Sequence, residues 1–213
     1  QATGSASIAD AAAWTGPNGT NAIFSVPSET PSIAVLDGVT TFDQVVVREI
    51  MAFDLSNESS DFGNLRVNGP TNLSPAVATV DGIGTISLLN DLQLGLEGHK
   101  GQLILTEDAT LDIDGEIRFD PSGTLQVVAS GEATVASSGR ISGGLNVSLP
   151  DGLVPTAGTT YSLIELTSPP SAGEDAFDLV SLPGLPGGLA FELSYGTAAA
   201  SGGWTASVEV VTL

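Results

Sequence analysis

The chain has 213 residues, of which 25 are acidic and 5 basic, and its formal net charge at pH 7 is −20. A surface this negative repels phosphate, which excludes nucleic acid as a partner and disfavours contact with anionic membranes. There is no cysteine, which excludes disulfides, thiol nucleophiles and thiolate-bound metals. Hydrophobic residues make up 41% of the chain, enough for a sizeable core, and no apolar run is long enough to predict a transmembrane helix.

Two features of the composition bear on the compartment. Lys100 is the only lysine, whereas cytosolic proteins usually balance lysine and glutamate on their surfaces. The first residue is Gln1, which fits a chain from which a signal peptide has been removed. We therefore expect an extracellular or cell-surface protein, in which three Asn-x-Ser/Thr sequons are candidate glycan sites: Asn18, Asn57 and Asn146.

Strand signals run along the whole chain, and helix signals are nearly absent. The only helix candidate is Ile8–Trp14, which could equally form an edge strand. Short alternating or β-branched runs, separated by Asx-Gly and Ser-Gly turn signals, predict an all-β chain. In chain order these runs are Ile33–Leu36, Gln44–Val47, Leu65–Val67, Val77–Val80, Thr85–Leu89, Leu92–Leu96, Leu103–Thr106, Thr110–Ile113, Glu116–Phe119, Thr124–Val128, Ala133–Val135, Leu145–Leu149, Tyr161–Leu166, Leu189–Tyr195 and Thr205–Val211.

A glycine followed by alternating apolar positions recurs along the first two thirds of the chain. The repeats begin about 21 residues apart, a period that predicts the rungs of a β-solenoid, at Gly38, Gly63, Gly84, Gly101, Gly123 and Gly144. Leucine, isoleucine and valine would then face inward, and the glycines would occupy bent or left-handed corners. A β-sandwich is the alternative that strand spacing alone leaves open.

The pattern changes after about residue 150, where proline and aromatic residues become frequent. We expect an N-terminal segment and cap at 1–30, about six solenoid rungs at 31–150, and a C-terminal antiparallel β cap or small sandwich at 151–213, since a solenoid needs its open ends covered. Four aromatic residues near the two ends are interpreted as cap residues rather than a sugar-stacking platform: Trp14, Tyr161, Tyr195 and Trp204.

Signals for chemistry are few. His99 is the only histidine and no Gly-x-Ser-x-Gly motif accompanies it, so a Ser-His-Asp triad is not expected. Asp112 and Asp114 share one face of a predicted strand and are candidate Ca²⁺ ligands, although a solvated acidic face is the preferred interpretation. Arg118 is the one basic residue near these acids that lyase chemistry could use. We expect no catalytic residue and no cofactor.

Several phrases carry a family resemblance. The segments Trp14–Gly19, Asn21–Phe24, Ile33–Leu36, Gly144–Ile164 and Phe177–Tyr195 resemble bacterial autotransporter-associated β-strand repeat proteins and related secreted β-solenoid surface proteins. The resemblance implies a secreted, surface-associated solenoid, and it implies no shared active site.

Together these observations predict a non-enzymatic extracellular structural protein. It would be the subunit of a surface filament, a surface layer or an adhesive structure, and its partner would be a second copy of itself joined through strand edges. The terminal segments at 2–13 and 207–213 are expected to donate strands to a neighbour. The run Trp204–Leu213 alternates cleanly and carries one charge, Glu209, so it lacks the usual protection of an edge strand. The alternative is a carbohydrate-binding or polysaccharide-degrading module on a parallel β-helix.

Overall fold

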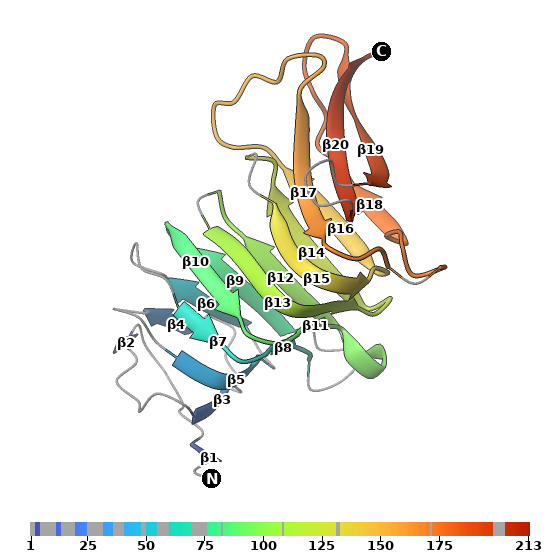
Figure 1. The fold of residues 1–213 in the computed structure, drawn as a ribbon. Helices are drawn as coiled ribbons and strands as arrows, with labels where there is room; N and C mark the ends of the chain where they lie inside the picture. Colours follow the sequence, from blue (N-terminus) through green and yellow to red (C-terminus); the bar gives the residue numbers. More distant parts are fainter. Residues whose placement is uncertain are drawn as a thin grey trace.

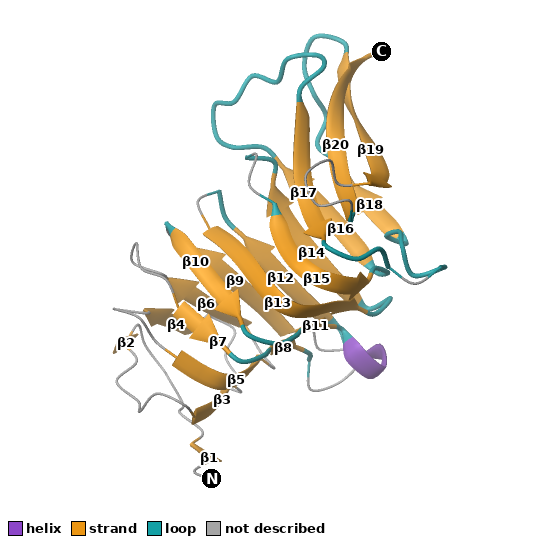
Figure 2. Cartoon of the chain, in the orientation of Figure 1, coloured by secondary structure: helices purple, strands orange, loops and turns teal. Residues whose placement is uncertain are grey.

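The computed structural model describes residues 3–4, 12–13, 20–24, 32–35, 41–47, 50–54, 60–69, 76–81, 83–107, 109–130, 133–170, 172–197 and 203–213. Within these ranges the regular secondary structure is almost entirely β-strand, and the single helical element is the short 3₁₀ turn η1 (Leu96–Gly98), as Figure 2 shows. The expectation of an all-β protein is confirmed. None of the described residues forms a helix that is long and apolar enough to cross a membrane.

The strands form two sheets that face each other across one hydrophobic core (Figure 1). Sheet A consists of β1 (Thr3–Gly4), β3 (Thr20–Phe24), β5 (Thr41–Val47), β7 (Ser60–Phe62), β8 (Leu65–Val67), β10 (Gly84–Leu88), β11 (Leu92–Leu94), β13 (Ala109–Phe119), β15 (Thr134–Arg140), β17 (Thr160–Leu166), β19 (Leu189–Thr197) and β20 (Trp204–Thr212). Sheet B consists of β2 (Ala12–Ala13), β4 (Ser32–Val35), β6 (Ile50–Asp54), β9 (Ala76–Asp81), β12 (Gly101–Leu105), β14 (Gly123–Val128), β16 (Gly144–Ser148) and β18 (Leu179–Ser181).

The chain alternates between the two sheets, and each strand pairs in parallel with the strands one repeat before and after it. Register partners from β2 to β16 are 19 to 27 residues apart. One repeat therefore contains both a sheet A segment and a sheet B strand. Parallel pairing of this kind does not fit an antiparallel sandwich, and it continues past residue 150 to β17 and β18.

The recurring glycines of the sequence do not all begin strands of the same sheet. Gly84 begins β10 in sheet A, whereas Gly101, Gly123 and Gly144 begin successive strands of sheet B. The short spacing between Gly84 and Gly101 is therefore a step from one sheet to the other within a repeat. Gly38 lies outside the described residues.

The alternation of apolar and polar residues explains which side chains enter the core. Leu103, Leu125 and Leu145 occupy one register position on neighbouring strands of sheet B, and each is fully buried. Phe62 and Leu88 occupy a matching position in sheet A and are equally buried. Successive side chains of a strand point to opposite faces of the sheet. Residues at one register position on neighbouring strands therefore form a ladder of side chains that all point toward the opposing sheet.

Sheet A ends differently from sheet B. Strand β20 pairs antiparallel with β17 on one side and with β19 on the other. These are the antiparallel pairs among the described strands, so the antiparallel region expected at 151–213 is limited to β17, β19 and β20. Since β20 reverses the direction of β17 and β19 reverses it again, β19 runs parallel to the rest of sheet A.

Candidate interaction surface

The two aspartates predicted as Ca²⁺ ligands lie on the outer face of β13. Asp112 and Asp114 are both exposed, as expected from their alternation with the buried Ile113. The register neighbours of Asp112 are Ser87 and Val135, and neither carries a carboxylate. Among the described residues, no three histidine, aspartate or glutamate side chains form a group that could hold a metal ion.

The other acids of this cluster are dispersed, and Glu107 is an exposed turn residue. Asp120 lies at the end of β13, where its carboxylate accepts a hydrogen bond from the Glu97 backbone N–H at 3.3 Å. Asp108 lies outside the described residues. The expected solvated acidic face is thus a set of separate outward carboxylates.

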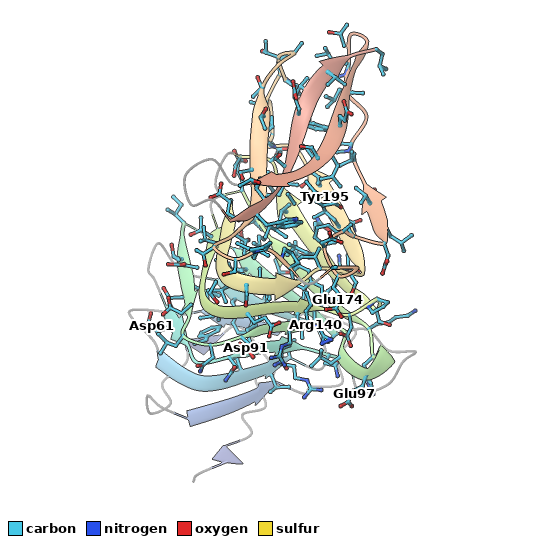
Figure 3. The ribbon with its side chains drawn as sticks, turned by 45° about the vertical axis from the view of Figure 1, so that its right-hand side comes forward. Asp61, Asp91, Glu97, Arg140, Glu174 and Tyr195 are labelled. Carbon is cyan, nitrogen blue, oxygen red and sulfur yellow. The ribbon has the colours of Figure 1, made fainter. Side chains whose placement is uncertain are left out.

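Polar side chains form a ladder where sheet A bends between β10 and β11. The Asp91 N–H donates to Asn64 Oδ1 at 3.2 Å, and the Glu116 N–H donates to Asp91 Oδ1 at 3.1 Å. Arg118 donates to Glu116 at 2.7 Å, and its guanidinium lies 3.8 Å from Asp91. Asp91 is labelled in Figure 3.

Arg118, the residue that lyase chemistry would require, is therefore engaged in an ion pair. The hydrogen bond to Glu116 raises the pKa of its guanidinium, so Arg118 stays protonated and is not a base. The ladder joins three repeats through side chain to backbone hydrogen bonds, which is a structural role. The sequence signals for it are the Asn-Asp and Asp-Gly pairs that also predict turns.

His99 contacts the loop after β8 rather than an acidic partner. Its Nδ1 lies 2.8 Å from the carbonyl oxygen of Gly69, and the side chain is half-buried. Beside it, Lys100 lines a shallow pocket of about 350 Å³ with five other described residues, none of them acidic: Gly101, Gln102, Pro121, Ser122 and Thr124. Two opposed carboxylates, which glycoside hydrolysis requires, are not among them.

The aromatic residues of the C-terminal region pack against the core. Trp204 is buried and stacks on Tyr195 with ring centres 5.6 Å apart. Tyr161, also buried, makes an edge contact with Phe191 at 6.2 Å. Tyr161, Phe191 and Trp204 belong to the hydrophobic core, and of the four residues only Tyr195 is more than a third exposed. Trp14 lies outside the described residues.

The most unusual surface lies at the same end of the molecule, where both sheets stop. Among the described strands, β18 is the last of sheet B and β19 the last of sheet A, so each has a paired neighbour on one side only. All three residues of β18 are exposed, including Leu179 at 72% and Val180 at 41%. An edge of this kind presents unpaired backbone N–H and C=O groups beside apolar side chains.

The strand expected to offer such an edge, Trp204–Leu213, does not. As β20, it is paired along both of its edges. The sequence alone did not indicate that β20 is an inner strand, because its place between β17 and β19 depends on tertiary pairing. Strand β19 takes the edge position instead. At the other end, Thr3–Gly4 and Ala12–Ala13 form β1 and β2, the outermost described strands of sheets A and B.

Of the three candidate glycan sites, Asn146 is described. It lies on the outer face of β16, half-buried, with Gln126 and Ser181 as its register neighbours. A glycan there would cover the flat outer face of sheet B. Asn18 and Asn57 lie outside the described residues.

No protein-family model matches the chain, and no curated protein or solved structure is significantly similar to it. The resemblance to autotransporter-associated repeat proteins stays a prediction.

Proposed function

We propose that the chain is a non-enzymatic, extracellular structural protein that associates with copies of itself through strand edges, as the subunit of a surface filament or layer. The two parallel sheets with strands alternating between them fit the walls of a β-solenoid, with β17, β19 and β20 at its C-terminal end. The observation that carries the proposal is the apolar edge of β18, which no described strand covers and where Leu179 and Val180 are exposed. Long parallel sheets normally blunt or cover such an edge.

The charge distribution supports the same function. Three ion pairs are formed by described residues, and all involve Arg118 or Arg140; Figure 3 shows Arg140 beside Glu174. With five basic residues against 25 acidic ones, attraction between oppositely charged patches of two copies is scarce. Association must come from backbone hydrogen bonds and apolar contacts. The acidic outer faces would keep a filament hydrated and separate from its neighbours.

Sedimentation velocity tests the proposal directly. The native protein should form species larger than a monomer as its concentration and the ionic strength rise. Parallel runs with Ca²⁺ and with a chelator separate an effect of Asp112 and Asp114 from general charge screening, because monovalent salt at equal ionic strength screens without coordinating. A protein that stays monomeric under all of these conditions would refute the proposal.

A second function is favoured by one observation, the pocket beside Lys100. Its volume of about 350 Å³ is within the range of sugar-sized ligand sites. Gln102, Ser122 and Thr124 are among the residues that line it, and their amide and hydroxyl groups suit the hydroxyls of a neutral glycan. A glycan array, with Thr124→Val as the variant that removes one hydroxyl at nearly constant volume, tests this binding function. No binding by the native protein would exclude it.

A further inference from the structure

The two strands that end the sheets at the C-terminal side run in the same direction as the strands they follow. Strand β18 pairs in parallel with β16. Strand β19 regains the direction of β17 because β20 lies antiparallel between them. Both open edges are therefore suited to one further parallel strand each.

The opposite end of the molecule offers such strands. Strands β1 and β2 are the outermost described strands of sheet A and sheet B, and each pairs in parallel on its other side. Figure 1 shows them at the far end of the stack from β18 and β19. Among the described strands, each end of the molecule thus has edges in both sheets that could continue the sheets of the other end.

We propose that copies of this chain join head to tail, with β2 of one copy adding to β18 of the next and β1 adding to β19, all in parallel. The proposal deepens the proposed function and rests on it. It commits to a second copy as the occupant, because a strand from either end of this fold has the direction and the sheet membership that the other end requires.

The last residue of one ladder of core side chains is partly exposed at this joint. Leu103, Leu125, Leu145 and Val180 occupy one register position on successive strands of sheet B. The first three are fully buried, whereas Val180 is 41% exposed because no described strand covers it. A strand from a second copy would bury Val180 as each earlier member of the ladder is buried.

The surface at one end differs from the surface at the other, so the contact is heterologous rather than isologous. Copies that add along the direction in which the strands stack leave a new free edge at each step, so the proposed assembly is open-ended. The product is a filament rather than a dimer. Charge opposes its growth, since each copy carries −20, and added salt should therefore promote assembly.

A cross-linking experiment on mixed variants tests the polarity of the joint. The chain has no cysteine, so only introduced thiols react. Ser181→Cys places a thiol on β18 and Ala13→Cys places one on β2. A short bis-maleimide, added at the salt concentration that promotes assembly, should link the two variants when they are mixed and should link neither variant alone.

The other outcomes overturn the inference. Linking of Ser181→Cys to itself would show a symmetric tail-to-tail contact. Assembly without any link would show that copies meet through another surface, and the proposed structural function would then survive. Absence of assembly in the unmodified protein would refute the proposed function itself.

A proline variant gives an independent readout. The Leu179 N–H donates to the Gly143 carbonyl at 3.0 Å, so Val180, the next residue of β18, directs its N–H to the open edge. Val180→Pro removes that donor without breaking the pairing with β16. Assembly should weaken about tenfold or more relative to Val180→Ala, which keeps the N–H. Equal assembly of the two variants, both with the native circular dichroism spectrum, would exclude β18 as the joint.

Discussion

Replacing Gly101 by alanine should destabilise the fold, because the chain passes there with no room for a side chain. A Cβ at this position would lie 2.0 Å from the carbonyl oxygen of Val67, at the end of β8. Methyl group and oxygen would have to separate by about 1.4 Å to reach an ordinary van der Waals distance. The same oxygen accepts a hydrogen bond from the Gly95 N–H at 3.2 Å, which that movement breaks.

The expected magnitude follows from these two effects. Overpacking a close contact costs about 1–3 kcal/mol, and losing the hydrogen bond adds roughly 1 kcal/mol, so Gly101→Ala should lower the free energy of unfolding by about 2–4 kcal/mol. Gly123 repeats the arrangement one turn later, where a Cβ would lie 2.5 Å from the Leu94 carbonyl oxygen. The smaller overlap there predicts a smaller loss for Gly123→Ala.

Urea unfolding followed by circular dichroism measures the effect, with Gly196→Ala as the control. Gly196 also lies in a strand, but nothing occupies the space of its Cβ, so this variant should be neutral or slightly more stable. The ordering should be Gly101→Ala least stable, then Gly123→Ala, then Gly196→Ala. A Gly101→Ala protein as stable as the control would refute the close approach of the repeats on which this account depends.

Three further predictions concern the core, the titration of one tyrosine and a pair of like charges. Leu125→Ala removes a fully buried ladder residue and should cost about 2–5 kcal/mol of unfolding free energy, measured in urea. Burial raises the pKa of Tyr195 above its ordinary value of 10.0, so in the Tyr161→Phe variant, where Tyr195 is the only tyrosine, absorbance near 295 nm should titrate above pH 10 in the folded protein. Because the folded state then keeps a proton that the unfolded state loses, the free energy of unfolding should fall as pH rises above 10. A titration midpoint of Tyr195 that is the same in the folded protein and in the urea-unfolded protein would contradict this prediction. Glu192 lies directly opposite Glu209 on the neighbouring strand, so Glu192→Gln should raise the melting temperature slightly, by relief of about 0.2–1 kcal/mol, and an unchanged melting temperature at low salt would count against it.

The all-β nature of the chain and its inward-facing residues could be predicted from the sequence, because both follow from local alternation. Leu111 and Leu125 alternate with polar neighbours and are buried as that pattern requires. The physical reason why glycine recurs at these positions could not be predicted from the sequence. Gly101 and Gly123 are required by close approach of another strand rather than by a left-handed backbone. A single sequence does not distinguish the two causes, because the approaching atoms belong to another repeat.

An open strand edge near the C-terminus could be predicted from the sequence, but the strand that carries it could not. The clean alternation and single charge of Trp204–Leu213 indicated an unprotected edge, yet that strand is central because β19 folds back onto it. The open edge at β18 is only three residues long, too short for a periodic pattern to mark it. Asp112 and Asp114 were placed correctly on one outward face, but the residues beside them depend on register between repeats.

Negative-stain electron microscopy of the native protein at low and high ionic strength tests the central claim most directly. We expect single particles at low salt and unbranched filaments one molecule wide at high salt, because screening removes the repulsion between copies that each carry −20. The Val180→Pro variant under the same conditions should form fewer and shorter filaments than the native protein. Native protein that shows only single particles at every salt and protein concentration would contradict the account.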